Sequence, residues 1–144
     1  MTRRAWRVGL LLALLAVPAL AGCAAEPVQQ PALDDTGWVL AEWGKTGALR
    51  PALDSRNVTL SFSRDTQASG NAGCNGWGGS CRLSRKGTIS FSEIIHTEMY
   101  CVEPGVMEQE QFFLDALLAA ERYEVVDGKL QITGGGMMLV LSRA

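Results

Sequence analysis

The chain has 144 residues, of which 47% are hydrophobic and 19% are charged, and its formal net charge at pH 7 is −2. This length is typical of one small domain. An acidic chain without a basic stripe does not suit a nucleic acid partner, because binding to phosphates depends on clustered lysines and arginines.

The N-terminus has the layout of a bacterial secretory signal. Three arginines within the first seven residues precede an apolar run at 8–20. That run is too short for a comfortable transmembrane helix, which needs about 20 apolar residues. It ends in LAGC at 20–23, which resembles the lipobox of bacterial lipoproteins. The resemblance implies a signal peptide at 1–22 and a Cys23 that carries diacylglyceryl and acyl chains such as palmitate. An ordinary signal peptide with an incidental cysteine is the alternative.

The residues after Cys23 indicate a destination and a domain boundary. Because Ala24 rather than aspartate follows the cysteine, the resemblance implies a lipid anchor in the outer membrane, facing the periplasm. Removal of the signal leaves ten basic and fifteen acidic residues, a net charge of −5. The proline- and glutamine-containing segment after the anchor lacks periodicity and is typical of a tether. We therefore predict a lipidated tether at 23–35 and a folded domain at 36–144.

Alternating apolar and polar residues predict short strands along the domain. Trp38 and Leu40 share one face near its start, a polar connection follows, and 57–63 alternates without interruption. Further strands are expected at about 66–75, 87–92, 123–126, 129–133 and 137–142, and 92–101 is expected to be irregular or a short edge strand. Together with one helix, the pattern indicates an α+β fold with a mostly antiparallel sheet of six to eight strands.

One amphipathic helix is predicted from about 106 to 120. Pro104 precedes it, and early glutamates suit the positive end of a helix. Its apolar stripe is predicted to consist of Val106, Phe113, Leu114, Leu117 and Leu118. Its solvated side is predicted to carry Glu108, Glu110 and Asp115.

The stretch GNAGCNGWGGSC at 70–81 holds five glycines and two cysteines. It is not a phosphate-binding loop, because no Gly-Lys-Ser/Thr leads into a helix. It also lacks a Cys-x-x-Cys redox motif. A zinc site formed by Cys74, Cys81, Cys101 and the single histidine, His96, would have unusual spacing. A disulfide is the better interpretation in an exported protein, and three pairings among the cysteines remain open.

An ordered set of segments resembles the META domain family of HslJ-like heat-shock lipoproteins. The segments are GWVLAEW, VTLSFS, ASGNAGCNGWGGS, ISFSEIIHTEMYC, EQEQFFLDALLAAERYEV, DGKLQIT and MMLVLS, which together span about 37–142. The resemblance implies that GNAGCNGWGGSC is a signature turn with a scaffold role, and that the sheet curls into a cracked barrel. It also implies a disulfide between Cys74 and Cys101, because Cys81 falls outside the family's motifs.

The resemblance further implies an envelope protein associated with stress tolerance and with no known reaction. We therefore expect a protein that is not an enzyme and needs no cofactor or metal, anchored to the membrane and supporting other envelope components by binding. The alternative is a carrier of a small apolar ligand, or a pilotin-like chaperone for an envelope protein.

Two residues bear on this choice. Trp77, among glycines, would mark a binding surface if exposed, although it would otherwise cover one end of the core. Cys81 is expected to be a free thiol whose pKa is lowered by the neighbouring Arg82, and therefore reactive towards alkylating agents. No general base accompanies it, so a catalytic role is not expected.

Overall fold

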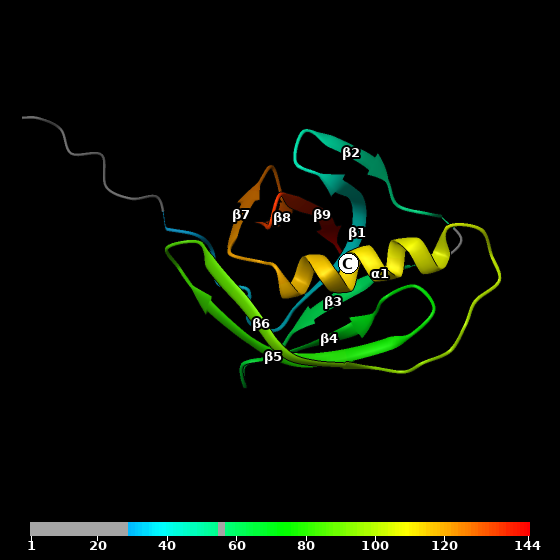
Figure 1. Ribbon diagram of the computed structural model, residues 1–144. Helices are drawn as coiled ribbons and strands as arrows, with labels where there is room; N and C mark the ends of the chain where they lie inside the picture. The colour runs from blue at the N-terminus through cyan, green and yellow to red at the C-terminus, as the bar shows by residue number, and fades with distance from the viewer. Residues whose placement is uncertain (1–28, 55–56) are drawn as a thin grey trace, which may run out of the picture.

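The computed structural model describes residues 29–54 and 57–144 (Figure 1). The expected signal peptide and Cys23 lie outside these residues. The described part of the chain forms nine strands and one helix. The elements are β1 (Thr36–Lys45), β2 (Ala48–Pro51), β3 (Thr59–Phe62), β4 (Gln67–Asn71), β5 (Gly76–Ser84), β6 (Thr88–His96), α1 (Val106–Leu118), β7 (Arg122–Val126), β8 (Lys129–Gly134) and β9 (Met137–Arg143).

The strands form one antiparallel sheet that closes on itself. Its order is β2-β1-β3-β4-β5-β6-β7-β8-β9, and β1 also pairs with β9. One edge of β1 pairs with β3 over 36–39 and with β2 over 42–45, so β2 is a short flap beside an eight-stranded barrel. The predicted α+β class with a curled antiparallel sheet and one helix is confirmed, with one strand more than the upper end of the expected range.

The barrel has a weak seam between β6 and β7. Their ladder consists of a single residue pair, Thr88 with Arg122. The next backbone bond along β6 runs from Ile89 N to Glu121 O, in the turn before β7, at 3.1 Å. Figure 1 shows α1 crossing the barrel beside this seam. The helix therefore occupies the place where the two halves of the sheet separate.

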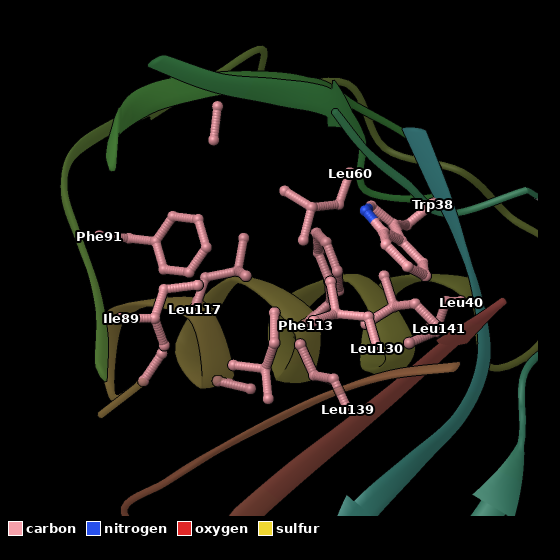
Figure 2. Packing of buried hydrophobic residues seen from close by; sticks show 14 of the residues in the cluster. Trp38, Leu40, Leu60, Ile89, Phe91, Phe113, Leu117, Leu130, Leu139 and Leu141 are labelled. Carbon is pink, nitrogen blue, oxygen red and sulfur yellow. The ribbon is translucent and has the colours of Figure 1, made fainter. Parts of the chain in front are cut away.

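The interior of the barrel is filled by side chains. Figure 2 shows Phe113 and Leu117 of α1 among the inward-facing residues of the strands. Leu60, Leu130 and Leu141 lie in the same cluster, and all five of these side chains have 0% exposure. Because alternate residues of each strand point inward, the alternation seen in the sequence produces this core directly.

The structure confirms most of the apolar stripe predicted for α1 and corrects the predicted exposure of two of its residues. The helix ends at Leu118 rather than near residue 120. Leu118, predicted to be buried, is 57% exposed, whereas Glu110, predicted to face solvent, is 3% exposed. Glu110 is buried because it meets polar partners inside the domain. Among the described residues, no helix is long and apolar enough to cross a membrane.

The described end of the expected tether packs against the barrel. Gln30 N donates to Arg85 O at 2.8 Å, and Gln30 Oε1 accepts from Val125 N at 2.9 Å. Leu33 is 2% exposed and belongs to the core. The chain therefore enters the domain beside the turn that joins β5 to β6, several residues before the predicted boundary at 36.

Candidate functional site

Three of the five glycines in GNAGCNGWGGSC are required by the backbone. A Cβ at Gly70 would lie 2.0 Å from Thr59 O, and a Cβ at Gly79 would lie 2.9 Å from Ser92 O. Gly73 has a φ of +125°, a region that side chains disfavour. These glycines let the strands approach closely and turn, which agrees with a scaffold role.

The other two glycines have no such explanation. Neither Gly76 nor Gly78 has a positive φ. A Cβ at Gly76 would meet only Gly70 O at 4.0 Å, and a Cβ at Gly78 would meet Ala68 O and Ser69 Cβ at 3.8 Å. These are ordinary contact distances, so the fold itself would accept side chains at both positions.

The two cysteines that match family motifs are bonded to each other. Cys74 and Cys101 form a disulfide across 27 residues of sequence, with their Cα atoms 5.8 Å apart. The bond joins the signature turn to the connection between β6 and α1. The pairing implied by the resemblance is therefore confirmed.

A buried carboxylate holds the signature turn from the other side. Glu110 Oε2 accepts hydrogen bonds from Cys74 N at 2.9 Å and from Asn75 N at 2.7 Å. Its Oε1 accepts from Asn75 Nδ2 at 2.6 Å. One side chain of α1 thus pairs two backbone donors and one amide donor that would otherwise be buried without partners.

Asn75 extends this network to the connection that follows β6. Its Oδ1 accepts from Thr97 Oγ1 at 2.8 Å and from Met99 N at 2.7 Å, and its Nδ2 donates to Met99 O at 3.0 Å. Asn75 is 2% exposed. The segment 97–101 is therefore fixed by a disulfide and by the Asn75 amide, which bonds to both the N–H and the C=O of Met99.

The fixed segment and its flanks carry exposed apolar side chains, which we call the apolar loop (residues 95–102). Ile95 is 75% exposed, Met99 58%, Tyr100 79% and Val102 84%. Four large exposed apolar residues within eight positions form the kind of patch that marks interaction sites. The bonds of Asn75 and the disulfide of Cys101 hold the backbone that carries Met99 and Tyr100.

A hollow of about 550 Å³ lies beside the apolar loop, on the outer face of β4, β5 and β6. Its lining includes Gly76, Gly78, Ile95 and Thr97. A second hollow of about 380 Å³ adjoins it and includes Ser80 and Glu93. The two share Ser69, Gly78 and Ile95, so they form one continuous depression, which we call the outer groove.

Trp77 lies beneath the outer groove and is not an exposed binding residue. Its side chain is 5% exposed and packs edge-on against Phe91 and Phe113, with ring centroids 6.4 and 5.8 Å away. Its Nε1 donates to Thr59 O at 3.2 Å. Of the two interpretations offered for this residue, the structure supports the cover over one end of the core.

Cys81 is the free cysteine of the described residues, and the expectation that it is reactive is wrong. Because β5 turns its side chain inward, it is 3% exposed. Burial raises its pKa from 9.0 to about 12. Arg82, the next residue of the strand, points to the opposite face.

The structure does not gather Cys81 and His96 with the disulfide cysteines, and no group of three or more potential metal ligands occurs in 29–54 and 57–144.

These features define a class of protein: a closed antiparallel barrel crossed by one helix, with a disulfide-bonded signature turn. The META domain family model matches residues 31–144. The chain therefore belongs to the META domain family. A comparison with curated proteins found no match.

Solved structures share this fold. An NMR structure of a protein from Burkholderia xenovorans is 30% identical, covers 91% of this chain and 99% of its own, and has a TM-score of 0.68. A second NMR structure is 21% identical with a TM-score of 0.62, covering 76% and 90% of the two chains. The crystal structure of a DUF4847 family protein from Bacteroides vulgatus is 12% identical with a TM-score of 0.54, covering 76% and 93%. The last two similarities concern the fold alone.

Proposed function

We propose that this protein is a lipid-anchored component of the bacterial cell envelope that is not an enzyme and acts by binding another envelope protein. Membership of the META domain family supports the envelope assignment, and the LAGC sequence at 20–23 supports the anchor at Cys23. On this proposal the outer membrane holds the protein on its periplasmic side, and the binding supports tolerance of envelope stress.

The observation that carries the binding role is the rigid presentation of the apolar loop. Exposing Met99, Tyr100 and Val102 to water is unfavourable, at about 25 cal/mol per Å² of apolar surface. A loop that only connected β6 to α1 would not need them. The disulfide and Asn75 hold the backbone of this loop in place, which lowers the entropy lost when a partner binds.

The filled interior supports binding on the surface over carriage of an apolar ligand inside the barrel. Phe113, Leu130 and Leu141 occupy the centre with 0% exposure. A carrier of the kind considered from the sequence would need this space. The filled interior does not separate the proposed binding function from the pilotin-like alternative, because a chaperone would also use an exposed apolar surface.

Site-specific photo-crosslinking in living cells tests the proposal. A photoreactive amino acid in place of Tyr100 is expected to give a discrete covalent adduct with one envelope protein. The control carries the same amino acid in place of Val126, an exposed apolar residue of β7 that lies outside the apolar loop. Absence of an adduct at Tyr100, or the same adducts at both positions, would contradict the proposal.

A further inference from the structure

The outer groove is open although the fold does not require it to be. Side chains at Gly76 and Gly78 would fill it, and both positions have room for a Cβ in an ordinary backbone conformation. Strands usually favour β-branched and aromatic residues over glycine. Gly76 and Gly78 lower the strand propensity of β5, and the backbone conformation does not require glycine at either position. Their effect is to leave bare backbone as the floor of the groove.

The groove also has a charged end. Glu93 of β6 lines its second hollow and is exposed. Glu93 Oε2 accepts a hydrogen bond from Ser80 Oγ at 2.8 Å, which orients the carboxylate towards β5. No lysine or arginine lines either hollow, and Glu93 is the acidic residue among the lining side chains. The charge complementary to this end of the groove is therefore positive.

We propose that the outer groove binds an extended segment of a partner protein in which an aromatic residue is followed two positions later by lysine or arginine. This inference rests on the proposed binding function and names the partner's recognition element. The aromatic ring lies flat on the backbone of Gly76 and Gly78 against Ile95. The cationic group reaches Glu93.

The spacing follows from strand geometry. Gly78 is paired with Ile95, and Ser80, two residues further along β5, is paired with Ser92 beside Glu93. Two strand residues span about 6.6 Å. Side chains two positions apart in an extended peptide lie on one face at the same spacing. A segment lying along β5 therefore presents residues i and i+2 to the two hollows.

An aromatic ring suits the first hollow better than an aliphatic side chain. Glycine backbone offers flat peptide groups, and a ring contacts them over its whole face. Aromatic side chains also bury a large area with few rotatable bonds, which explains their frequency at binding hot spots.

Fluorescence polarisation of labelled peptides tests the inference. The full chain is reconstituted in nanodiscs of neutral phospholipid and titrated with a fluorescein-labelled heptapeptide, Gly-Ser-Trp-Ser-Lys-Ser-Gly. Two matched peptides replace Trp by Ser or Lys by Glu. The Trp/Lys peptide is expected to bind at least about tenfold more tightly than the peptide without Trp, as for an interface hot spot.

Two variants and a control locate the site. Gly78→Val fills the groove and is expected to weaken binding about tenfold or more, since it excludes the hot-spot ring. Glu93→Gln is expected to weaken binding of the Lys peptide about two- to fivefold and to remove its advantage over the Glu peptide, as for an exposed ion pair. Ser90→Val, an exposed position of β6 away from the groove, is expected to bind as the original chain does. Circular dichroism of each variant confirms that the fold is retained.

The outcomes separate this inference from the function on which it rests. Equal binding by Gly78→Val and the original chain, or no preference for the Trp/Lys peptide, overturns the outer groove as the site. If Tyr100→Ser abolishes peptide binding while Gly78→Val does not, the groove assignment fails and the apolar loop still binds. If no peptide binds, the inference is overturned, and crosslinking from position 100 decides the proposed function separately.

Discussion

Glu110 is a buried side chain on which two separate segments depend. It accepts three hydrogen bonds from Cys74 and Asn75, and Asn75 in turn holds Met99. Removal of the carboxylate leaves buried backbone donors without partners, and each unpaired group costs about 1–3 kcal/mol. The glutamate therefore stabilises the signature turn and the apolar loop together.

Glu110→Ala is expected to lower the free energy of unfolding by about 2–5 kcal/mol, because two buried backbone N–H groups lose their acceptor. Glu110→Gln keeps one carbonyl oxygen and should lose less. Glu108→Ala is the control, since Glu108 forms an exposed ion pair with Arg50, a type worth less than about 1 kcal/mol. Urea midpoints measure all three, and equal losses in the two alanine variants would refute the role of Glu110.

Cys81 should be inert in the folded protein. Burial keeps the thiol from reagents, and its raised pKa of about 12 keeps it protonated at neutral pH. Iodoacetamide at pH 8 is expected to leave Cys81 unmodified in the native state and to modify it fully in guanidinium, as measured by intact mass. Rapid modification of the native protein would show that the strand opens or that the side chain faces outward.

The same thiol makes stability depend on alkaline pH. Its folded pKa of about 12 lies above the unfolded value of 9.0, so its contribution is complete below pH 9 and is lost as pH rises towards 12. Tyr123 acts in the same direction, because burial also raises its pKa. In Cys81→Ala the fall of the unfolding free energy between pH 9 and 12 should be shallower than in the original chain. An unchanged slope would contradict the assignment.

At the scale of single elements, α1 provides a paired test within two adjacent residues. Leu117 has 0% exposure and Leu118 has 57%. Leu117→Ala is expected to lower the unfolding free energy by about 2–5 kcal/mol, as for buried leucines in general, whereas Leu118→Ala should change it by about 0.5 kcal/mol or less. Similar denaturant midpoints for the two variants would mean that the helix is rotated from the orientation described above.

The error at Glu110 had a detectable cause in the sequence. Glu110 lies four residues after Val106 and four before Leu114, so it stands on the apolar stripe itself. A carboxylate on a buried stripe indicates buried partners, and the prediction weighed only its charge. Leu118 shows the opposite error: it is apolar, but the helix ends there.

The strands differed in how well their sequences predicted them. Clear alternation predicted β3 and β8, and Asp127-Gly128 predicted the hairpin between β7 and β8, with its positive φ values of 51° and 76°. By contrast, β2 and β5 were not predicted. β2 has four residues, too few to show a period, and six of the nine residues of β5 are glycine, serine or arginine. The strand conformation of both comes from pairing with their neighbours. The outer groove depends on the register of three strands, which a single sequence does not specify.

At the scale of the whole molecule, the proposal requires that the membrane attachment depend on Cys23 alone. Cys23→Ser is expected to move the protein from the membrane fraction to the periplasmic fraction, or to leave it unprocessed, and to abolish incorporation of labelled palmitate. Stable anchoring normally requires more than one acyl chain. The lipobox resemblance places these chains on Cys23. Continued lipid labelling of Cys23→Ser would refute the anchor. Ser61→Ala, at an exposed position of β3, is the control and should stay in the membrane fraction.

The bond between Gln30 and Arg85 also sets a direction for the molecule. Figure 1 shows the chain entering beside the turn between β5 and β6, while the connection from β6 to α1 lies at the opposite end. The nine residues of β5 span about 30 Å at 3.3 Å per residue. With the proposed anchor at Cys23, this hairpin would separate the end at which the described chain enters the domain from Met99 and Tyr100. Such a geometry favours partners that extend into the periplasm, and it disfavours proteins confined to the plane of the same membrane.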